Sequence, residues 1–258
     1  MKKDVIMYMI IQRTRGSAIV YQEHERFIIP QEHMKLWRYM DLSKFIYLLS
    51  GKLFFSRMDK FEDNFEVTYP KYNLEMRPVV YKGILDDVQV QNLSNSLEKI
   101  SEKIKMKSYA CCWHINDYES AAMWKLYLSS NEGIAIQTNV SKLIESLKQE
   151  VKHIYIGKVN YIDYNSEYLP EDNLLNLLLY KRKSFEHERE LRCIYTALFD
   201  DDRDIPGVDI SIDLTELIEK IYISPTAPAY FKKIVEDVIE KYGYEFEVTQ
   251  STMYSGLY

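Results

Sequence analysis

Apolar residues along the first 60 positions follow two periodicities, which predict strands around one helix. The helix is expected after Asp41, a residue type that caps helices well, because apolar side chains then recur at helical spacing. It should end at Gly51, since glycine readily adopts the left-handed conformation that stops a helix. β-Branched and aromatic residues predict strands at residues 5–11, 18–29, 35–39 and 53–56.

The same two patterns recur along the rest of the chain. Asn116 and Glu119 form a capping pattern at the start of one expected helix, and a run of leucines faces another. Helices are predicted at residues 84–107, 117–130, 173–183 and 228–243, with a short one ending at 149. Strands are predicted at residues 109–113, 133–138, 153–164, 191–199, 221–224 and 244–249.

No internal repeat, low-complexity tract or Gly/Ser/Pro-rich linker divides the sequence. One compact domain is therefore expected over residues 37–258, after an extension of strands at residues 1–36. The predicted fold class is α+β, with a mixed or mostly antiparallel central sheet that is flanked by helices.

Composition narrows the classes of partner. The net charge of −6 argues against a protein that grips phosphate backbones through a general positive field. The apolar run at residues 5–11 is too short for a membrane anchor and lacks a signal-peptide cleavage site, so no membrane association is expected. Three cysteines without regular spacing fit a reducing cytoplasm.

The densest chemistry lies in the segment KSFEHERELR, residues 183–192. If residues 188–192 are extended, Glu188, Glu190 and Arg192 share one face, roughly 6.6 to 7 Å apart. Such a row either lines a cleft, where Arg192 keeps one carboxylate ionised, or forms a solvated strand edge that discourages aggregation. In a helix, Glu188 and Arg192 would instead form an i,i+4 pair.

A second group of carboxylates and aromatics occupies residues 61–66. Asp63 and Asn64 are typical of an Asx turn, which would bring Asp63 or Glu66 to the rim of a pocket. Trp37 and Tyr39 share one face of the preceding strand, where they serve either as core or as a platform for a planar ring.

Metal and nucleotide motifs are missing from the sequence. Cys112 and His114 lie two residues apart, but no other histidine pair has a spacing that completes a zinc site, so no metal is expected. The Walker, GxGxxG, GxSxG, HExxH and EF-hand patterns do not occur. On the helix at 117–130, Trp124, Tyr127 and Leu128 fall on one face.

The ordered set of segments WRY, LFFSRMDKFEDNFE, CCWH, MWKLY, GIAI and KSFEHERELR resembles the bacterial domain-of-unknown-function family 2971. The resemblance spans roughly residues 37–224. This chain departs from the family pattern in three places: its acidic turn lacks proline, His114 replaces a small polar residue, and Phe185 stands near the place of a tryptophan.

The order of elements is also similar to that of ADP-ribosyltransferase-like enzymes, and this resemblance implies NAD as cofactor. Glu190 would stabilise the oxocarbenium-like state, and Glu188 would position or deprotonate the acceptor. Arg192 or Arg38 would bind a phosphate, and Tyr39 would stack on nicotinamide. Further candidates are Ser56, Trp124 and Tyr127 for the cofactor, and Asp63, Glu66 and Lys183 elsewhere in the site.

Three functions remain open from the sequence. The first is an NAD-using ADP-ribosyltransferase or NAD glycohydrolase that acts as a bacterial effector in phage defence or toxicity. It would have a protein or nucleic-acid acceptor and a neutralising or regulatory partner protein. The second is a non-catalytic module that binds a small molecule or a protein. The third is a metal-dependent nuclease built on the carboxylates Asp63, Glu66, Glu188 and Glu190.

Overall fold

The computed structural model describes residues 24–128, 130–198 and 204–255, and these form a single α+β domain. Its main sheet is mixed but mostly antiparallel: the strand order is β11-β10-β4-β1-β3-β2-β9, with β8 on the free edge of β3 and β5 on β8. A small parallel pair, β6 and β7, lies apart from it. The strands are β1 (Lys35–Asp41), β2 (Lys52–Arg57), β3 (Ser108–Ile115), β4 (Gly133–Asn139), β5 (Tyr155–Lys158), β6 (Asn160–Ile162), β7 (Tyr180–Arg182), β8 (Glu190–Thr196), β9 (Gly207–Ser211), β10 (Lys220–Ile223) and β11 (Val248–Gln250).

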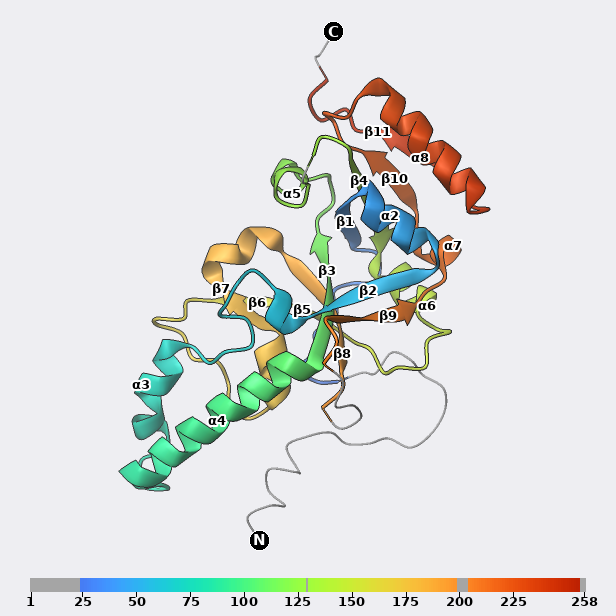
Figure 1. Ribbon diagram of the computed structural model, residues 1–258. Coiled ribbons are helices and arrows are strands. Elements are labelled where there is room, and N and C mark those ends of the chain that lie inside the picture. The colour runs from blue at the N-terminus through green and yellow to red at the C-terminus, as the bar shows by residue number, and fades with distance from the viewer. Residues whose placement is uncertain (1–23, 129, 199–203, 256–258) are drawn as a thin grey trace.

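Helices cover both faces of this sheet. The α-helices are α2 (Leu42–Leu49), α3 (Lys71–Val80), α4 (Asp87–Lys107), α5 (Ala121–Leu126), α6 (Val140–Ser146), α7 (Leu214–Leu217) and α8 (Ala229–Lys241). Three 3₁₀ helices are η1 (Met58–Lys60), η2 (Leu174–Leu178) and η3 (Lys183–Glu188). As Figure 1 shows, α4 extends from β3 away from the sheet, with α3 beside its outer part.

The largest core lies on one face of the sheet, under α2, α6, α7 and α8. Alternation along β1 divides its side chains: Leu36 and Met40 enter this core, whereas Trp37 and Tyr39 enter a small aromatic cluster on the opposite face. That opposite face carries the candidate site. Within the described ranges, no helix is long and apolar enough to cross a membrane.

The sheet splits beside β3. One edge of β3 pairs with β8 along its whole length, so β1 and β2 must share the other edge. There β1 pairs only with His114 and Ile115, while β2 pairs only with Tyr109 and Ala110. The two strands therefore diverge around residues 111–113 and leave a gap in the sheet.

Most predicted elements are confirmed. The first helix begins after Asp41 and ends before Gly51, as the sequence predicted. Gly51 ends α2 at φ 76°, the conformation for which glycine is favoured. Asp41 precedes the helix, although its side chain makes no capping bond. The long helix begins later than predicted, because Asp86 and Gln89 form a capping box at its start.

The leucine-rich helix predicted at residues 173–183 is wrong. Asn173 caps the short helix η2, and Tyr180 then begins β7. Four leucines of this run, Leu175, Leu177, Leu178 and Leu179, are all buried. A segment that is buried on every side carries no helical stripe, so its periodicity could not separate helix from irregular structure.

The helix predicted at residues 117–130 is much shorter, and its cap is different. Ser120 is the N-cap of α5 and accepts from the Met123 N–H at 3.4 Å. The expected capping pair is not formed, because Asn116 donates to the Tyr118 carbonyl and Glu119 accepts from the Trp124 indole.

Several strand predictions also need correction. Residues 24–29 form no strand, and the rest of the first two predicted strands lies outside the described residues. The strand predicted at 153–164 is two strands interrupted at Val159, and that predicted at 244–249 is only β11. The strand predicted at 191–199 ends at Thr196, and residue 199 is not described. The sequence patterns missed α3, α7 and β9.

Candidate functional site

A cavity of about 960 Å³ opens where β1 and β2 diverge. Its wall includes most of the predicted site residues: Arg38, Tyr39, Ser56, Asp63, Glu66, Tyr127, Glu188 and Glu190. Segments that are far apart in sequence therefore meet at one hollow. The acidic turn after β2 forms one side, and the end of η3 with the start of β8 forms another.

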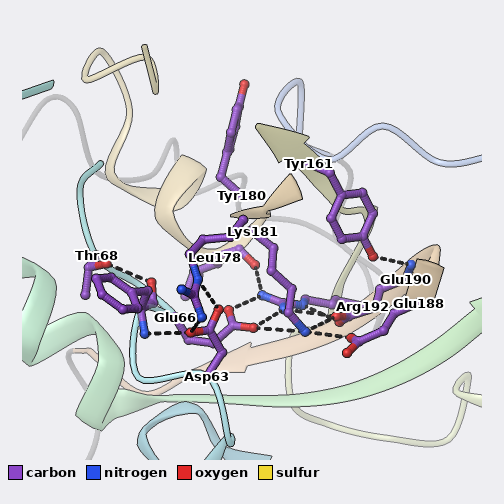
Figure 2. A network of polar contacts seen from close by, with 12 residues as sticks. Asp63, Glu66, Thr68, Tyr161, Leu178, Tyr180, Lys181, Glu188, Glu190 and Arg192 are labelled. Carbon is purple, nitrogen blue, oxygen red and sulfur yellow. Dashed lines mark hydrogen bonds and ion pairs between the residues drawn. The ribbon is translucent and has the colours of Figure 1, made fainter. Parts of the chain in front are cut away.

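A network of three carboxylates and two cations lies at the base of this cavity (Figure 2). The Lys181 ammonium donates to Glu188 at 2.6 Å and to Glu190 at 2.7 Å, and it lies 3.4 Å from Glu66. The Arg192 guanidinium donates to Glu190 through Nε at 2.8 Å and to Glu66 through both terminal nitrogens, at 3.0 and 2.7 Å.

All N–H groups of Arg192 and Lys181 are used on partners inside the protein. Arg192 also donates to the Leu178 carbonyl at 2.9 Å and makes a longer contact of 3.5 Å with Glu190. Its five N–H groups therefore all have acceptors, and the three on Lys181 have three carboxylates. Burying so many charges is tolerable only because they are paired in this way.

The chain brings the carboxylates together by local geometry. Glu190 and Arg192 alternate on one face of β8, as the spacing predicted. Glu188 is not part of that row, because it ends η3, and Arg189 then turns the chain at φ 42°. The prediction of three same-face residues is thus wrong for Glu188, although its carboxylate still reaches Lys181.

Two non-glycine residues in the described ranges have a left-handed backbone, and both adjoin the network. They are Arg189, which precedes Glu190, and Val67, which follows Glu66. Val67 is the more costly, because a β-branched side chain crowds the backbone at its φ of 56°. Such strain costs of the order of 1–3 kcal/mol per residue and clusters at functional sites.

Lys183 does not take part in the network, which corrects its prediction as a site residue. Its side chain is exposed, whereas Lys181, two residues earlier, is buried among the carboxylates. The sequence reasoning missed Lys181 because it placed this residue at the basic end of the predicted helix, outside the charged segment that begins at Lys183. The structure separates them because Lys181 lies in β7, whereas Lys183 lies beyond the end of this strand and begins η3.

Burial and neighbouring charges shift the pKa values of Glu188 and Glu190 in opposite directions. Burial first, and then the hydrogen bond and negative charge of Glu190, raise the pKa of Glu188 to about 8. For Glu190, burial alone would raise the pKa, but Arg192, a hydrogen bond with Glu188 and Lys181 hold it well below its ordinary range. One carboxyl is therefore protonated at neutral pH while its neighbour is ionised.

The acidic turn is held by a second ion pair. Asp63 accepts from the Phe65 N–H at 3.0 Å, which is the Asx turn predicted from sequence. It also binds Arg182 through two bonds, of 2.7 and 3.2 Å. The Arg182 guanidinium lies over the rings of Phe65 and Phe185, at 4.4 and 5.2 Å from their centroids. The turn and η3 are thereby fixed to each other.

An aromatic wall faces the carboxylates. The ring of Tyr39 stacks near Trp37, with centroids 6.4 Å apart, and meets Trp124 edge to face at 4.9 Å. Trp37 and Trp124 are buried, and Trp124 does not line the cavity, so it supports Tyr39 from behind. Tyr127 does line the cavity, and burial together with the charge of Glu188 raises its pKa.

His114 is a further buried group of the cavity wall. Its Nδ1 contacts the Glu188 carbonyl at 2.7 Å, an arrangement in which the ring donates. Burial lowers its pKa, so the ring is neutral and Nε2 is left as an acceptor without a partner among the described residues. The sequence signal was its place two residues after Cys112, where it was weighed as a metal ligand.

Arg38 reaches into the gap in the sheet. It donates to the thiol of Cys111 and lies over the Trp113 ring at 5.9 Å. Neither partner carries a negative charge, and burial lowers its pKa. Arg38 thus differs from Arg192, whose side chain is fully buried and already bound to Glu66 and Glu190.

In the part of the chain that the structure describes, no group of three His, Cys, Asp or Glu side chains is arranged to hold a metal ion. Glu66, Glu188 and Glu190 do converge, but on Lys181 and Arg192 instead. Comparison with protein-family models and with curated proteins finds no match to this chain.

Proposed function

We propose that this protein cleaves the bond between nicotinamide and ribose in NAD, and transfers ADP-ribose to an acceptor or to water. The observation that carries the proposal is the pair Glu188 and Glu190, two adjacent carboxyls on one cavity wall with pKa values pushed apart. Such a pair supplies an ionised and a protonatable group at the same place.

The chemistry assigns a role to each carboxyl. The C1′–N bond breaks with its electron pair leaving on nicotinamide, and the positive charge that develops on the ribose is stabilised by ionised Glu190. An oxygen or nitrogen of the acceptor then bonds to C1′, and its proton passes to the ionised form of Glu188. The rate should therefore rise with pH towards the pKa of Glu188, about 8.

The rest of the wall supports binding of the cofactor. Tyr39 offers a ring braced by Trp37 and Trp124, against which nicotinamide can stack. Arg38 is the better candidate for a phosphate, because every donor of Arg192 is already used inside the protein. The resemblance to ADP-ribosyltransferase-like enzymes points to the same cofactor.

The test is release of nicotinamide from NAD by the purified full chain, followed by chromatography. Glu190→Gln should lower the rate at least a hundredfold, since removing one group that stabilises transition-state charge typically has that effect. Glu186→Gln, an exposed change in the preceding 3₁₀ helix η3, should leave the rate unchanged. Full activity of folded Glu190→Gln would contradict the proposal.

The biological setting follows the family resemblance and is part of the proposal. A bacterial effector that consumes NAD in the reducing cytoplasm should arrest growth when it is expressed, and its three cysteines are free thiols, as that compartment requires. A neutralising partner protein would then restore growth, whereas Glu190→Gln would make it unnecessary.

A ligand-binding module without catalysis is the second candidate, and one observation favours it. Glu66 and Glu190 are almost completely buried, and their charges are matched within the protein. A network of this kind also suits a purely structural role. The distinguishing result is calorimetric binding of NAD or ADP-ribose without any turnover, unchanged in Glu190→Gln.

A further inference from the structure

The cavity continues beyond the carboxylates, along the outer face of β2. Lys52, Phe54 and Ser56 alternate on this face, and all three line the cavity. Alternate residues of a strand lie roughly 6.6 to 7 Å apart, so the row spans about 13 Å. Ser56 stands at its inner end, where it pairs with Ala110 of β3. The outer end of this row, at Lys52 and Phe54, has no role in the proposed cleavage of the glycosidic bond.

The outer end presents two ordered aromatic rings. Phe54 and Tyr47 are 40% and 42% exposed, and their rings meet edge to face with centroids 6.4 Å apart. A Cβ atom on Gly207 would lie 2.1 Å from Cζ of the Phe54 ring, so the far end of that ring lies against Gly207. The Tyr47 hydroxyl donates to Asp209. Exposed rings held in place in this way are suited to stacking by a nucleobase.

Three lysines line the same cavity as these rings: Lys44, Lys52 and Lys60. Their nearest carboxylates lie at 3.9, 3.8 and 3.2 Å, and the lysine side chains are 68%, 53% and 51% exposed. Exposed pairs of this length are weak, so the ammonium groups are available to another anion. Lys181, which is locked among three carboxylates, is not.

We infer that the outer end of the cavity is a nucleotide subsite, where a base stacks on Phe54 beside the perpendicular Tyr47 ring and phosphates contact Lys52 and its neighbours. The inference rests on the proposed function, because it makes the outer nucleotide the adenylate half of NAD. The cavity volume of about 960 Å³ lies at the upper end for small-ligand sites, as a ligand with two bases requires. Binding energy gained there is available to orient the reacting half.

Calorimetry with three ligands tests the subsite: AMP, ADP-ribose and nicotinamide riboside, which lacks the adenylate. Phe54→Ala should weaken AMP and ADP-ribose about tenfold or more, the usual loss when a stacking ring is removed. Nicotinamide riboside should bind the variant as it binds the wild type. Changing Lys52 and Lys60 together to Gln should weaken the phosphate-bearing ligands and flatten their salt dependence.

Two controls make the result specific. Gly207→Ala keeps every side chain of the subsite but displaces the Phe54 ring, so it should reproduce the loss seen for Phe54→Ala. Lys183→Gln changes an exposed lysine outside the cavity and should have no effect. Thermal melts establish that each variant is folded.

The subsite and the proposed reaction fail separately. If AMP and ADP-ribose bind through Phe54 but NAD is never cleaved, the subsite stands and the catalytic proposal falls. If NAD is cleaved but Phe54→Ala changes neither KM nor AMP affinity, the subsite is wrong. A short oligothymidylate that binds through Phe54 while AMP does not would also overturn it, because the occupant would then be a nucleic acid.

Discussion

Arg192 binds Glu66 through two hydrogen bonds, of 3.0 and 2.7 Å, and both side chains have no exposed surface. The pair joins β8 to the acidic turn that follows β2, two segments 126 residues apart. It therefore sets where the turn lies against the strand, and with it one side of the cavity.

Removing one partner of this pair should be costly. Arg192→Met leaves Glu66 and Glu190 buried with Lys181 as their remaining cation, and loss of one partner of a buried pair typically costs about 3–5 kcal/mol. Urea unfolding measures the change in the free energy of unfolding. Lys158→Met, an exposed change on β5, is the matched control. Adding Glu66→Leu to Arg192→Met should recover part of the loss; if the single variant loses under about 1 kcal/mol, the pair does not hold the turn.

The sequence predicted the parts of the network that depend on local spacing. Alternation along β8 put Glu190 and Arg192 on one face, and the Asx turn at Asp63 has the expected bond to Phe65. The pairing of Arg192 with Glu66 could not be predicted, because no spacing rule relates residues 126 positions apart in the chain.

Lys181 shows a different limit. Its neighbours 174–179 are leucines except for Asn176, which is also buried, so an α-helical period fitted them as well as the short 3₁₀ helix that they form. That prediction of a helix hid the strand β7, and with it the lysine that points at the carboxylates. Lys183, the exposed lysine, was taken as the site residue because it begins the charged segment KSFEHERELR.

The two lysines provide a direct comparison. Lys181→Met should destabilise the protein by about 3 kcal/mol or more, because Glu66, Glu188 and Glu190 would lose their shared ammonium. Lys183→Met changes an exposed side chain and should stay within about 0.5 kcal/mol of wild type. Parallel urea melts give both values. Equal effects would mean that Lys181 is not the cation of the network.

The raised pKa of Glu188 predicts how stability depends on pH. Its pKa lies near 4.5 in an unfolded chain and at about 8 in the fold, so the folded state binds the extra proton between these values. Stability from this group is complete at the acidic end and is lost as pH rises through the window. The slope is at most about 1.4 kcal/mol per pH unit, and solvent screening at this partly exposed carboxyl reduces it.

The variant Glu188→Gln isolates this dependence. His114 acts in the opposite sense, because burial lowers its pKa, but it contributes equally to wild type and variant. The difference in unfolding free energy between the two proteins should therefore shift steadily against wild type from pH 5 to 8. Glu186→Gln should follow wild type throughout. A difference that does not change with pH would show that Glu188 titrates normally.

Tyr39→Phe separates the ring of the aromatic wall from its hydroxyl. The hydroxyl oxygen accepts from the Ser120 N–H at 2.8 Å, and Ser120 caps the short helix α5. Losing that acceptor should cost about 1 kcal/mol, because one buried donor is left without a partner. The edge-to-face contact with Trp124 needs only the ring and should persist. Hydrogen exchange at the Ser120 amide should speed up while the tryptophan bands of the near-ultraviolet circular dichroism spectrum stay the same. If exchange there is unchanged, the tyrosine hydroxyl does not hold α5, and the wall depends on ring packing alone.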